Sequence, residues 1–417
     1  MGAPIILDWG MFGELALRIA RELGECFYFS PWASSFPKPD QQLICAGLED
    51  YGVTRVDFPL GLLDHGHDPG CWIFPDLYFT DLQSLLRKLG CEVWGSGWGE
   101  LLELDRWKLH LVLEEAGWPV PEAERLVGIT HLEQRLRAEP EQLFVKLAPY
   151  YRGLTETYEH RGWPASRTWL EETRAKLGPR GDTMPFMLQR AVPGSDVVEP
   201  GMDLIILNGR IQYPTLIGWE RKGVGLISKV VDAIPEALAG AVETVVSALS
   251  REMAAPYTNF FSAELRVNED REAYFIDATC RMPRPGDGAH MELCDNLGEV
   301  MTEAAEPIYG ARYACQIMLE SAQAEKRPLH IAFPAEYRDN IKLYWFYRDE
   351  QEEYWTLPNA ITNVVSVVAV GDDLEEVKKQ ALEIAESVKA DGLNYESNVF
   401  DLIEEEIEKG EAKGIAW

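Results

Sequence analysis

Residues 261–281 read Phe-Ser-Ala-Glu-Leu-Arg-Val-Asn-Glu-Asp-Arg-Glu-Ala-Tyr-Phe-Ile-Asp-Ala-Thr-Cys-Arg, with a polar segment at 268–271 between two alternating runs. Alternation of apolar and polar residues on both sides of such a segment predicts a β-hairpin. In the strand 262–267 we expect one apolar face and one polar face, formed by Ala263, Leu265 and Val267, and by Ser262, Glu264 and Arg266. In the strand 273–281 the corresponding faces hold Tyr274, Ile276 and Ala278, and Phe275, Asp277, Thr279 and Arg281.

Aligning the two apolar faces predicts the register of this hairpin. Val267 then pairs with Tyr274 and Leu265 with Ile276, and Glu264 lies opposite Asp277. Opposed side chains have Cβ atoms about 4.5–5.5 Å apart, and like charges at that separation destabilise a sheet, so a compensating cation is expected. Mg²⁺ fits, because it takes one or two carboxylates together with phosphate oxygens. Two other interpretations stay open: arginines neutralise a face that meets water, or the two acids share a proton as a general acid/base pair.

The composition excludes several classes of protein. The 417 residues hold 39 Lys and Arg against 69 Asp and Glu, a formal net charge of −30, which disfavours broad binding to nucleic acid or to anionic membranes. Only a local cluster such as Arg281 and Arg284 could attract a polyanion. The hydrophobic fraction of 46% and aromatic fraction of 11% are typical of packed globular proteins. At about 150 residues per domain, we expect two to four domains.

The sequence also predicts a compartment. No run approaches the roughly 18 apolar residues of a membrane helix, and the start has no basic segment before Asp8. The 7 cysteines form no Cys-x-x-Cys pair, which is typical of reduced thiols. We therefore expect a cytoplasmic protein without a membrane segment.

Strand and helix patterns alternate through residues 1–98, which predicts a parallel, Rossmann-like α/β domain. Its first turn, Gly10-x-x-Gly13, fits the dinucleotide motif poorly, so we interpret the domain as a packing scaffold or as part of a substrate site. Residues 99–320 form a second predicted domain. A third, small α+β domain is expected over 321–417, giving a chain of α/β and α+β class overall.

Four further motifs lie upstream of the hairpin, in chain order. They are Leu104-Asp-Arg-Trp-Lys108 with Gly117-Trp-Pro-Val-Pro121, then Phe144-Val-Lys146, then the loop 147–157, and then Met187-Leu-Gln-Arg-Ala-Val-Pro-Gly-Ser-Asp-Val-Val-Glu199. Together with the hairpin acids, this series resembles the ATP-grasp superfamily over roughly residues 100–300. The resemblance implies an ATP-grasp fold with an N-terminal pre-ATP-grasp domain, a lid subdomain at about 118–190 and a C-terminal domain.

The resemblance also implies roles for individual residues. Metal binding falls to Glu264 and Asp277, and contact with the nucleotide phosphates to Lys108 and Lys146, with Gly153 and Thr155 in the covering loop. Adenine and ribose contacts fall to Gln189, Ala191, Val192 and Asp196. Arg281 matches the arginine that stabilises the γ-phosphate and the tetrahedral intermediate, while Arg266 and Arg284 are expected to hold the acid substrate and to wall the acceptor site.

The implied activity is that of an ATP-dependent ligase. A carboxylate, amino-acid-like in the nearest group, is phosphorylated to an acylphosphate and joined to an amine, with ATP and Mg²⁺ (or Mn²⁺) as cofactors. The nearest group is that of the glycinamide ribonucleotide synthetases (phosphoribosylamine–glycine ligases). Their E-F-N-x-R-x-G-D-P-E run is replaced here by residues 277–287, so their substrates are not transferred to this chain. Small-molecule partners and a monomer or homodimer are expected. A kinase-type phosphotransferase and a non-catalytic nucleotide-binding regulator are the alternatives.

Overall fold

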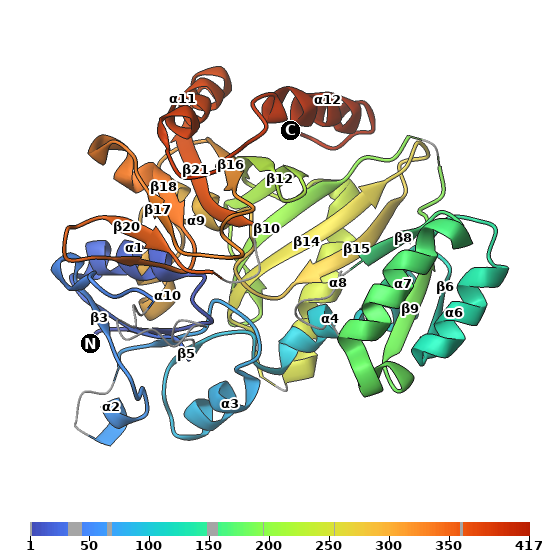
Figure 1. Cartoon of the computed structure of the whole chain (residues 1–417), viewed down its shortest axis with the longest axis horizontal. Coiled ribbons are helices and arrows are strands. Elements are labelled where there is room, and N and C mark those ends of the chain that lie inside the picture. Colours follow the sequence, from blue (N-terminus) through green and yellow to red (C-terminus); the bar gives the residue numbers. More distant parts are fainter. Residues whose placement is uncertain are drawn as a thin grey trace.

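The structure is a computed structural model, which describes residues 2–31, 44–64, 69–147, 157–194, 196–253, 255–358 and 362–417. Figure 1 shows the N-terminal domain, the central sheet and a separate helix-and-sheet unit side by side, with the C-terminal helices above the central sheet. Within the described residues, no helix is both long and apolar enough to span a membrane.

The N-terminal domain is built on a parallel sheet in the order β3-β2-β1-β4-β5. Its strands are β1 (Ile5–Leu7), β2 (Cys26–Phe29), β3 (Val53–Arg55), β4 (Trp72–Ile73) and β5 (Val93–Trp94). Its helices are α1 (Gly13–Leu23), α2 (Gly61–Asp64), α3 (Thr80–Lys88) and the short η1 (Glu49–Tyr51) and η2 (Gly97–Glu100). The predicted Rossmann-like domain is confirmed. The strand order reverses between β1 and β4, where ligands bind in open α/β sheets.

A large antiparallel sheet runs through the middle of the molecule, in the order β15-β14-β10-β12-β13-β16-β21-β18 with β11 beside β10. The strands are β10 (Pro200–Leu207), β11 (Arg210–Ile211), β12 (Thr215–Arg221), β13 (Gly225–Val231), β14 (Asn259–Val267), β15 (Ala273–Thr279), β16 (Tyr313–Glu320), β18 (Ile341–Leu343) and β21 (Asn363–Gly371). The helices around it are α4 (Leu101–Leu104), α5 (Arg106–Glu115), α8 (Glu236–Met253), α9 (Asp287–Leu293), α10 (Leu297–Glu303), α11 (Leu374–Ser387) and α12 (Val399–Ala412).

Two smaller sheets complete the fold. One, in the order β6-β9-β7-β8, consists of β6 (Ala123–Val127), β7 (Leu143–Leu147), β8 (Thr157–His160) and β9 (Pro185–Arg190), with α6 (Ile129–Ala138), α7 (Trp163–Leu177) and η3 (Gly178–Asp182). It has a hydrophobic core of its own around Leu132, Leu170 and Phe186. The other, in the order β17-β20-β19, consists of β17 (Leu329–Ile331), β19 (Phe346–Arg348) and β20 (Tyr354–Thr356), with η4 (Ala335–Asn340) nearby.

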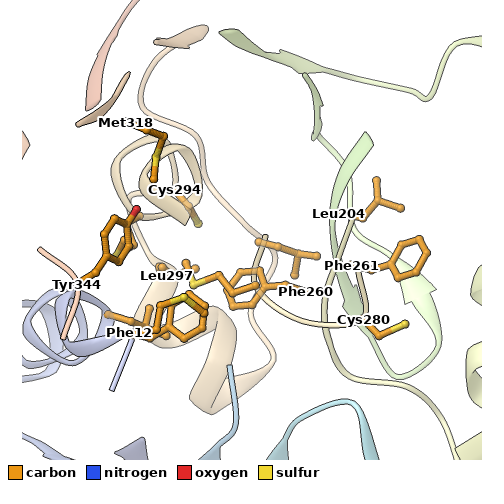
Figure 2. Close-up of a cluster of buried hydrophobic side chains, with 14 of the residues drawn as sticks. Phe12, Leu204, Phe260, Phe261, Cys280, Cys294, Leu297, Met318 and Tyr344 are labelled. Atoms are coloured by element: carbon orange, nitrogen blue, oxygen red, sulfur yellow. The ribbon is translucent and has the colours of Figure 1, made fainter. Parts of the chain in front are cut away.

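One hydrophobic core joins the N-terminal domain to the central sheet. Figure 2 shows part of it, to which Phe12 contributes just before α1, Leu297 from α10 and Phe260 from β14. The central sheet also continues across the predicted boundary at residue 320, because β16 pairs with β21 from the C-terminal segment. The domain boundaries placed at residues 98 and 320 therefore stay a prediction.

The predicted hairpin forms, and Glu264 lies directly opposite Asp277. The register beyond that pair is a correction to the prediction. The ladder shifts between Glu264 and Leu265, so that Leu265 pairs with Phe275 and Val267 with Ala273. A β-bulge of this kind adds one residue to one strand, here at Ile276. The sequence predicted that Tyr274 and Ile276 face the core. Phe275 joins the core in their place.

Candidate active site

The two acids lie on a polar face of the central sheet. Glu264 and Asp277 are cross-strand partners on β14 and β15, the neighbouring strands labelled in Figure 1. On β14 the core takes the alternate residues Ala263, Leu265 and Val267, as the sequence predicted. This alternation is what turns Glu264 away from the core.

Arg106 holds Asp277. Its Nε and Nη2 atoms donate to Asp277 Oδ2 at 3.1 and 3.0 Å, and the arginine is only 3% exposed. The second carboxylate oxygen, Oδ1, accepts from the Ala278 backbone N–H at 3.0 Å. Oδ2 thus accepts two hydrogen bonds and Oδ1 accepts one, so the remaining one of about four acceptor sites of the carboxylate is on Oδ1.

Sequence reasoning missed Arg106 and chose Lys108 from the same helix. The ammonium of Lys108 pairs with Glu252 on α8, and Lys108 is not among the residues that line the cavities described below. Residues two positions apart in an α-helix are separated by about 200° of rotation, so Arg106 and Lys108 point to opposite sides of α5. The only sequence signal for Arg106 is its place two residues before Lys108 in the same motif.

Lys222 is a second cation that the sequence did not indicate. It lies in the turn between β12 and β13, and its Nζ is 3.0 and 3.2 Å from the two carboxylate oxygens of Glu264. Its side chain is 68% exposed, so it can leave the acid without losing buried contacts. From the sequence alone, a lysine in a tight turn is normally a surface residue, and no motif beside Lys222 indicates another role.

Burial and charge separate the titration of the two acids. Burial raises the pKa of Glu264, which Lys222 opposes and Asp277 reinforces. Burial on its own also raises the pKa of Asp277, but Arg106 and Lys146 outweigh it and hold that pKa below its usual range. A bound cation would favour the charged form of both acids.

Lys146 lies one residue before the end of β7, near the strand end where the sequence predicted it. It is buried, and its Nζ donates to the backbone carbonyl of Ile276 at 3.1 Å. Because β15 is the edge strand and Ile276 is its bulged residue, this carbonyl faces the lysine instead of a neighbouring strand. Burial lowers the pKa of Lys146 to about 8, although Asp277 opposes the shift.

A cavity of about 230 Å³ adjoins the acid pair and the N-terminal domain. Arg281 connects Glu103 with Asp76 of the N-terminal domain. Its Nε donates to Glu103 Oε1 at 2.9 Å, and its Nη1 donates to Asp76 Oδ1 at 3.1 Å. Asp76 follows β4, at the point where the strand order of the N-terminal sheet reverses. Arg281 thus contacts both domains at the wall of this cavity.

Arg284 lines the same cavity from the loop after β15. Its guanidinium carbon lies 4.7 Å from the ring centroid of Tyr344 and 5.7 Å from that of Trp345. Its buried Nη1 atom has no hydrogen-bond partner among the described residues. A guanidinium fixed against two rings, with a donor to spare, is suited to hold an anion. His290 and Asp287, further along, lie in the protein interior.

A larger cavity of about 640 Å³ lies between the small β6–β9 sheet, the central sheet and α12. Ala191 and Val192 line it, and Phe144, Trp219 and Ile403 supply apolar walls. Arg266 also faces this cavity and donates to Glu199 Oε2 at 2.8 Å, so it does not join Arg281 and Arg284.

The remaining predicted nucleotide contacts are divided. Gln189 lines a narrow space together with Arg106 and Lys146. Asp196 is paired with Lys413 at 2.7 Å and is not among the residues that line the large cavity. Gly153 and Thr155 lie outside the described residues. The roles predicted for all these residues stay predictions.

The donor set fits a metal ion that arrives with a phosphate ligand. Among the described residues, no cluster of three or more His, Cys, Asp or Glu side chains could hold a metal ion by itself. Glu264 and Asp277 offer two carboxylates, which is the number that Mg²⁺ commonly takes from protein when phosphates supply the rest. The acid pair is therefore suited to a magnesium–phosphate complex and not to a closed structural site.

No protein-family model and no curated protein sequence matches this chain. Solved structures do match it. Phosphoribosylamine–glycine ligase from Thermotoga maritima has a TM-score of 0.67 at 15% identity, covering 95% of this chain and 99% of that one. The biotin carboxylase domain of Hydrogenobacter thermophilus 2-oxoglutarate carboxylase, solved with MgADP, ADP and bicarbonate, has a TM-score of 0.65 at 11% identity over 99% and 96%. L-amino acid ligase from Bacillus licheniformis has a TM-score of 0.60 at 15% identity over 95% and 99%.

Proposed function

Because this chain has the ATP-grasp fold, shared along almost its whole length with those enzymes, we propose that it is an ATP-dependent carboxylate–amine ligase. A carboxylate is phosphorylated by ATP to an acylphosphate, and an amine then displaces the phosphate. The products are the amide, ADP and phosphate.

The observation that carries this proposal is the opposed pair of Glu264 and Asp277, with cationic side chains close by. Arg106 donates to Asp277, and Lys222 donates to Glu264. The charge of Lys146 helps to lower the pKa of Asp277, and Arg281 and Arg284 line the cavity beside the acids. Phosphoryl transfer depends mainly on positioning and on neutralising charge, and little on a protein nucleophile.

We place the nucleotide in the cavity of about 640 Å³, with its base at Ala191 and Val192. Support comes from the apolar walls of this cavity. Lys146 and Gln189 both line a second, narrow space. Glu199, which lines the cavity, takes over the ribose contact that the sequence assigned to Asp196. The structure similar to this chain that holds MgADP supports the same class of ligand.

Each residue then has a distinct task. Lys146 binds phosphate oxygens, and Arg281 orients the acid substrate between the two domains. Arg106 keeps Asp277 ionised and fixed. Glu264 and Asp277 would hold Mg²⁺, which when bound supplies positive charge to the phosphates. Lys222 would leave Glu264 for the nucleotide.

Finer points belong to the same proposal. We infer small-molecule acid and amine substrates, a cytoplasmic location, Mn²⁺ as a substitute ion, and a monomer or homodimer. The biotin carboxylase domain similar to this chain was solved as a dimer, which supports a homodimer.

Hydroxylamine provides a test that needs no knowledge of the amine. The protein is incubated with ATP, Mg²⁺, hydroxylamine and single carboxylic acids, and ADP and hydroxamate are measured. An acylphosphate gives hydroxamate in equal amount to ADP. ADP with a stable phosphorylated product and no hydroxamate indicates a kinase-type enzyme. Absence of ADP with every acid favours a nucleotide-binding regulator and contradicts the proposal.

A further inference from the structure

An ion pair joins two walls of the cavity of about 640 Å³ that are distant in the chain. One wall is the loop between β9 and β10, which contributes Ala191, Val192, Gly194, Val197 and Glu199. The other wall is α12, which contributes Leu402, Ile403, Glu405 and Glu406. Nζ of Lys413, the residue after α12, lies 2.7 Å from Oδ2 of Asp196 in the loop. The proposed function gives this pair no task.

The ammonium of Lys413 is built into the end of α12. The side chain is only 7% exposed, and the backbone N–H donates to the carbonyl of Gly410 at 2.9 Å. Ile415, two residues further, is completely buried, so the chain is held on both sides of the lysine. A cation at a helix C-terminus is also favoured by the partial negative charge there. Removal of Asp196 would thus leave a fixed, buried ammonium without its counter-charge.

Asp196 forms the exposed half of the pair. Its side chain is 59% exposed, and it is not among the residues that line the cavity. The hydrogen bond from Lys413 lowers its pKa, so the carboxylate stays charged near neutral pH. Because water can solvate an exposed carboxylate, the pair can open at little cost. The position of Asp196 outside the cavity favours a contact with α12 over a contact with the ribose.

The loop that carries Asp196 connects two separately packed parts. β9 belongs to the small sheet, which has a hydrophobic core of its own, and β10 belongs to the central sheet, on which α12 packs. The loop is fixed at both ends, because the Arg190 N–H donates to the carbonyl of Glu122 at 2.8 Å and Val198 exchanges two backbone hydrogen bonds with Val267. Asp196 lies between these ends. Its pair with Lys413 therefore attaches the middle of the loop to α12.

We propose that the ion pair of Lys413 and Asp196 is the closing contact of the nucleotide cavity, and that bound ADP leaves when this contact opens. Lys413 is then a positioning residue, which acts through Asp196 to hold the loop with Ala191 and Val192 against α12. The inference rests on the nucleotide position in the proposed function. It also gives Asp196 a role different from the ribose contact that the sequence resemblance implied.

The test measures how fast ADP leaves. A fluorescent N-methylanthraniloyl derivative of ADP is bound in the presence of Mg²⁺ and displaced by unlabelled ADP in a stopped-flow instrument. Asp196→Asn and Lys413→Met should each raise the dissociation rate about 10-fold, as expected for loss of a charge-assisted contact. The double variant should stay within about threefold of either single variant, because both substitutions remove the same contact. Glu408→Gln, at an exposed acid of α12 that does not line the cavity, is the control and should release ADP at the wild-type rate.

Three outcomes, in variants shown by thermal melting to be folded, would overturn the inference and leave the nucleotide site intact. One is an unchanged dissociation rate in both single variants. Another is a raised rate in Asp196→Asn but not in Lys413→Met, which would mean that Asp196 contacts the nucleotide directly. The third is a double variant in which the two effects multiply. A wild-type protein that does not bind the labelled ADP would overturn the inference together with the nucleotide site of the proposed function.

Discussion

Asp277 and Glu264 share one site but have very different partners. The guanidinium of Arg106 is buried against Asp277, whereas the ammonium of Lys222 is mostly in water beside Glu264. Loss of a buried partner leaves an uncompensated charge, while loss of an exposed one does not. The two acids should therefore be equally important for turnover and unequal for stability.

Asp277→Asn and Glu264→Gln test this difference as a matched pair. Both should lower ADP formation at least about 100-fold, because each removes charge from the site of phosphoryl transfer. Asp277→Asn should also lower the free energy of unfolding by about 2–4 kcal/mol, since it leaves Arg106 without its carboxylate. Glu264→Gln should change it by less than about 1 kcal/mol. Urea unfolding measures both, and equal destabilisation would contradict the assignment of Arg106.

Lys146 and Lys108 form a second matched pair. Lys146→Met should reduce ADP formation at least about 100-fold, because the buried ammonium is placed to bind phosphate. Lys108→Met should leave it within about threefold, since that lysine pairs with Glu252 on another helix. Steady-state ADP release at saturating ATP is the measurement. A large loss from Lys108→Met would restore the role that the sequence motif assigned to it.

At these positions the sequence predicted the acids and missed their cations. Alternation of polar and apolar residues identifies which strand residues face away from the core, so Glu264 and Asp277 could be paired from the pattern. Arg106 and Lys222 reach the site from a helix and a turn that are distant in the chain, and alternation says nothing about such contacts. Lys108 was favoured over Arg106 because a motif gives the neighbourhood and not the face of the helix.

Among the elements, the hairpin shows what a regular pattern cannot predict. The pairing of Glu264 with Asp277 follows from alternation, whereas the bulge at Ile276 interrupts it. Phe275, Ile276 and Tyr274 are all apolar, so the sequence offers no signal for which of them turns inward. The bulge matters because the carbonyl of Ile276 accepts the hydrogen bond from Lys146.

Helix α12 closes one side of the large cavity, and its packing depends on Gly410. Figure 1 shows α12 above the central sheet, and it packs on β12 and β13. A Cβ atom at Gly410 would lie 2.1 Å from Cη2 of the buried Trp219, which lines the cavity with Ile403. The helix can approach the sheet this closely only because residue 410 has no side chain.

Gly410→Ala should push α12 away from Trp219. We expect a loss of about 1–3 kcal/mol in stability from overpacking, larger than the gain in helix propensity, and a rise in the KM of ATP. Thermal melting and steady-state kinetics measure the two effects. Glu408→Ala, at an exposed position of the same helix, is the control and should change neither. An unaltered KM of ATP in a folded Gly410→Ala variant would separate α12 from nucleotide binding.

At the scale of the whole molecule, the order of the sequence motifs predicted the fold, whereas the composition predicted only a packed globular protein. The Rossmann-like sheet and the hairpin both appear as expected. Pairing of β16 with β21 could not be foreseen, because long-range partners of apolar strands carry no local signal. For the same reason, the cavities between domains were not predictable in shape.

The core that joins the domains contains an ionisable group, His290. Its ring lies 5.0 Å from that of Phe260, and neither ring nitrogen has a partner among the described residues. Burial lowers the pKa of His290 to about 3. Between that value and the usual pKa of about 6.5, the unfolded chain binds a proton that the folded protein does not, so stability falls as the pH falls.

From pH 7 to pH 5, His290 should therefore cost about 2 kcal/mol of stability. His290→Leu should remove that part of the loss, which urea unfolding at the two pH values measures as a difference between variant and wild type. His131→Leu, which replaces an exposed histidine, should leave the pH dependence unchanged. Identical pH dependence in wild type and His290→Leu would mean that His290 already takes up a proton in the folded protein.

Titration calorimetry with ATP, in Mg²⁺ and again in EDTA, tests the assignment of the acid pair most directly. We predict that Mg²⁺ tightens ATP binding to the wild type by about 10-fold or more, and that Glu264→Gln abolishes most of that difference. Comparing the two conditions within each variant removes any effect of the released Lys222 on phosphate binding. Equal dependence on Mg²⁺ in wild type and Glu264→Gln would contradict a magnesium–nucleotide site on β14 and β15.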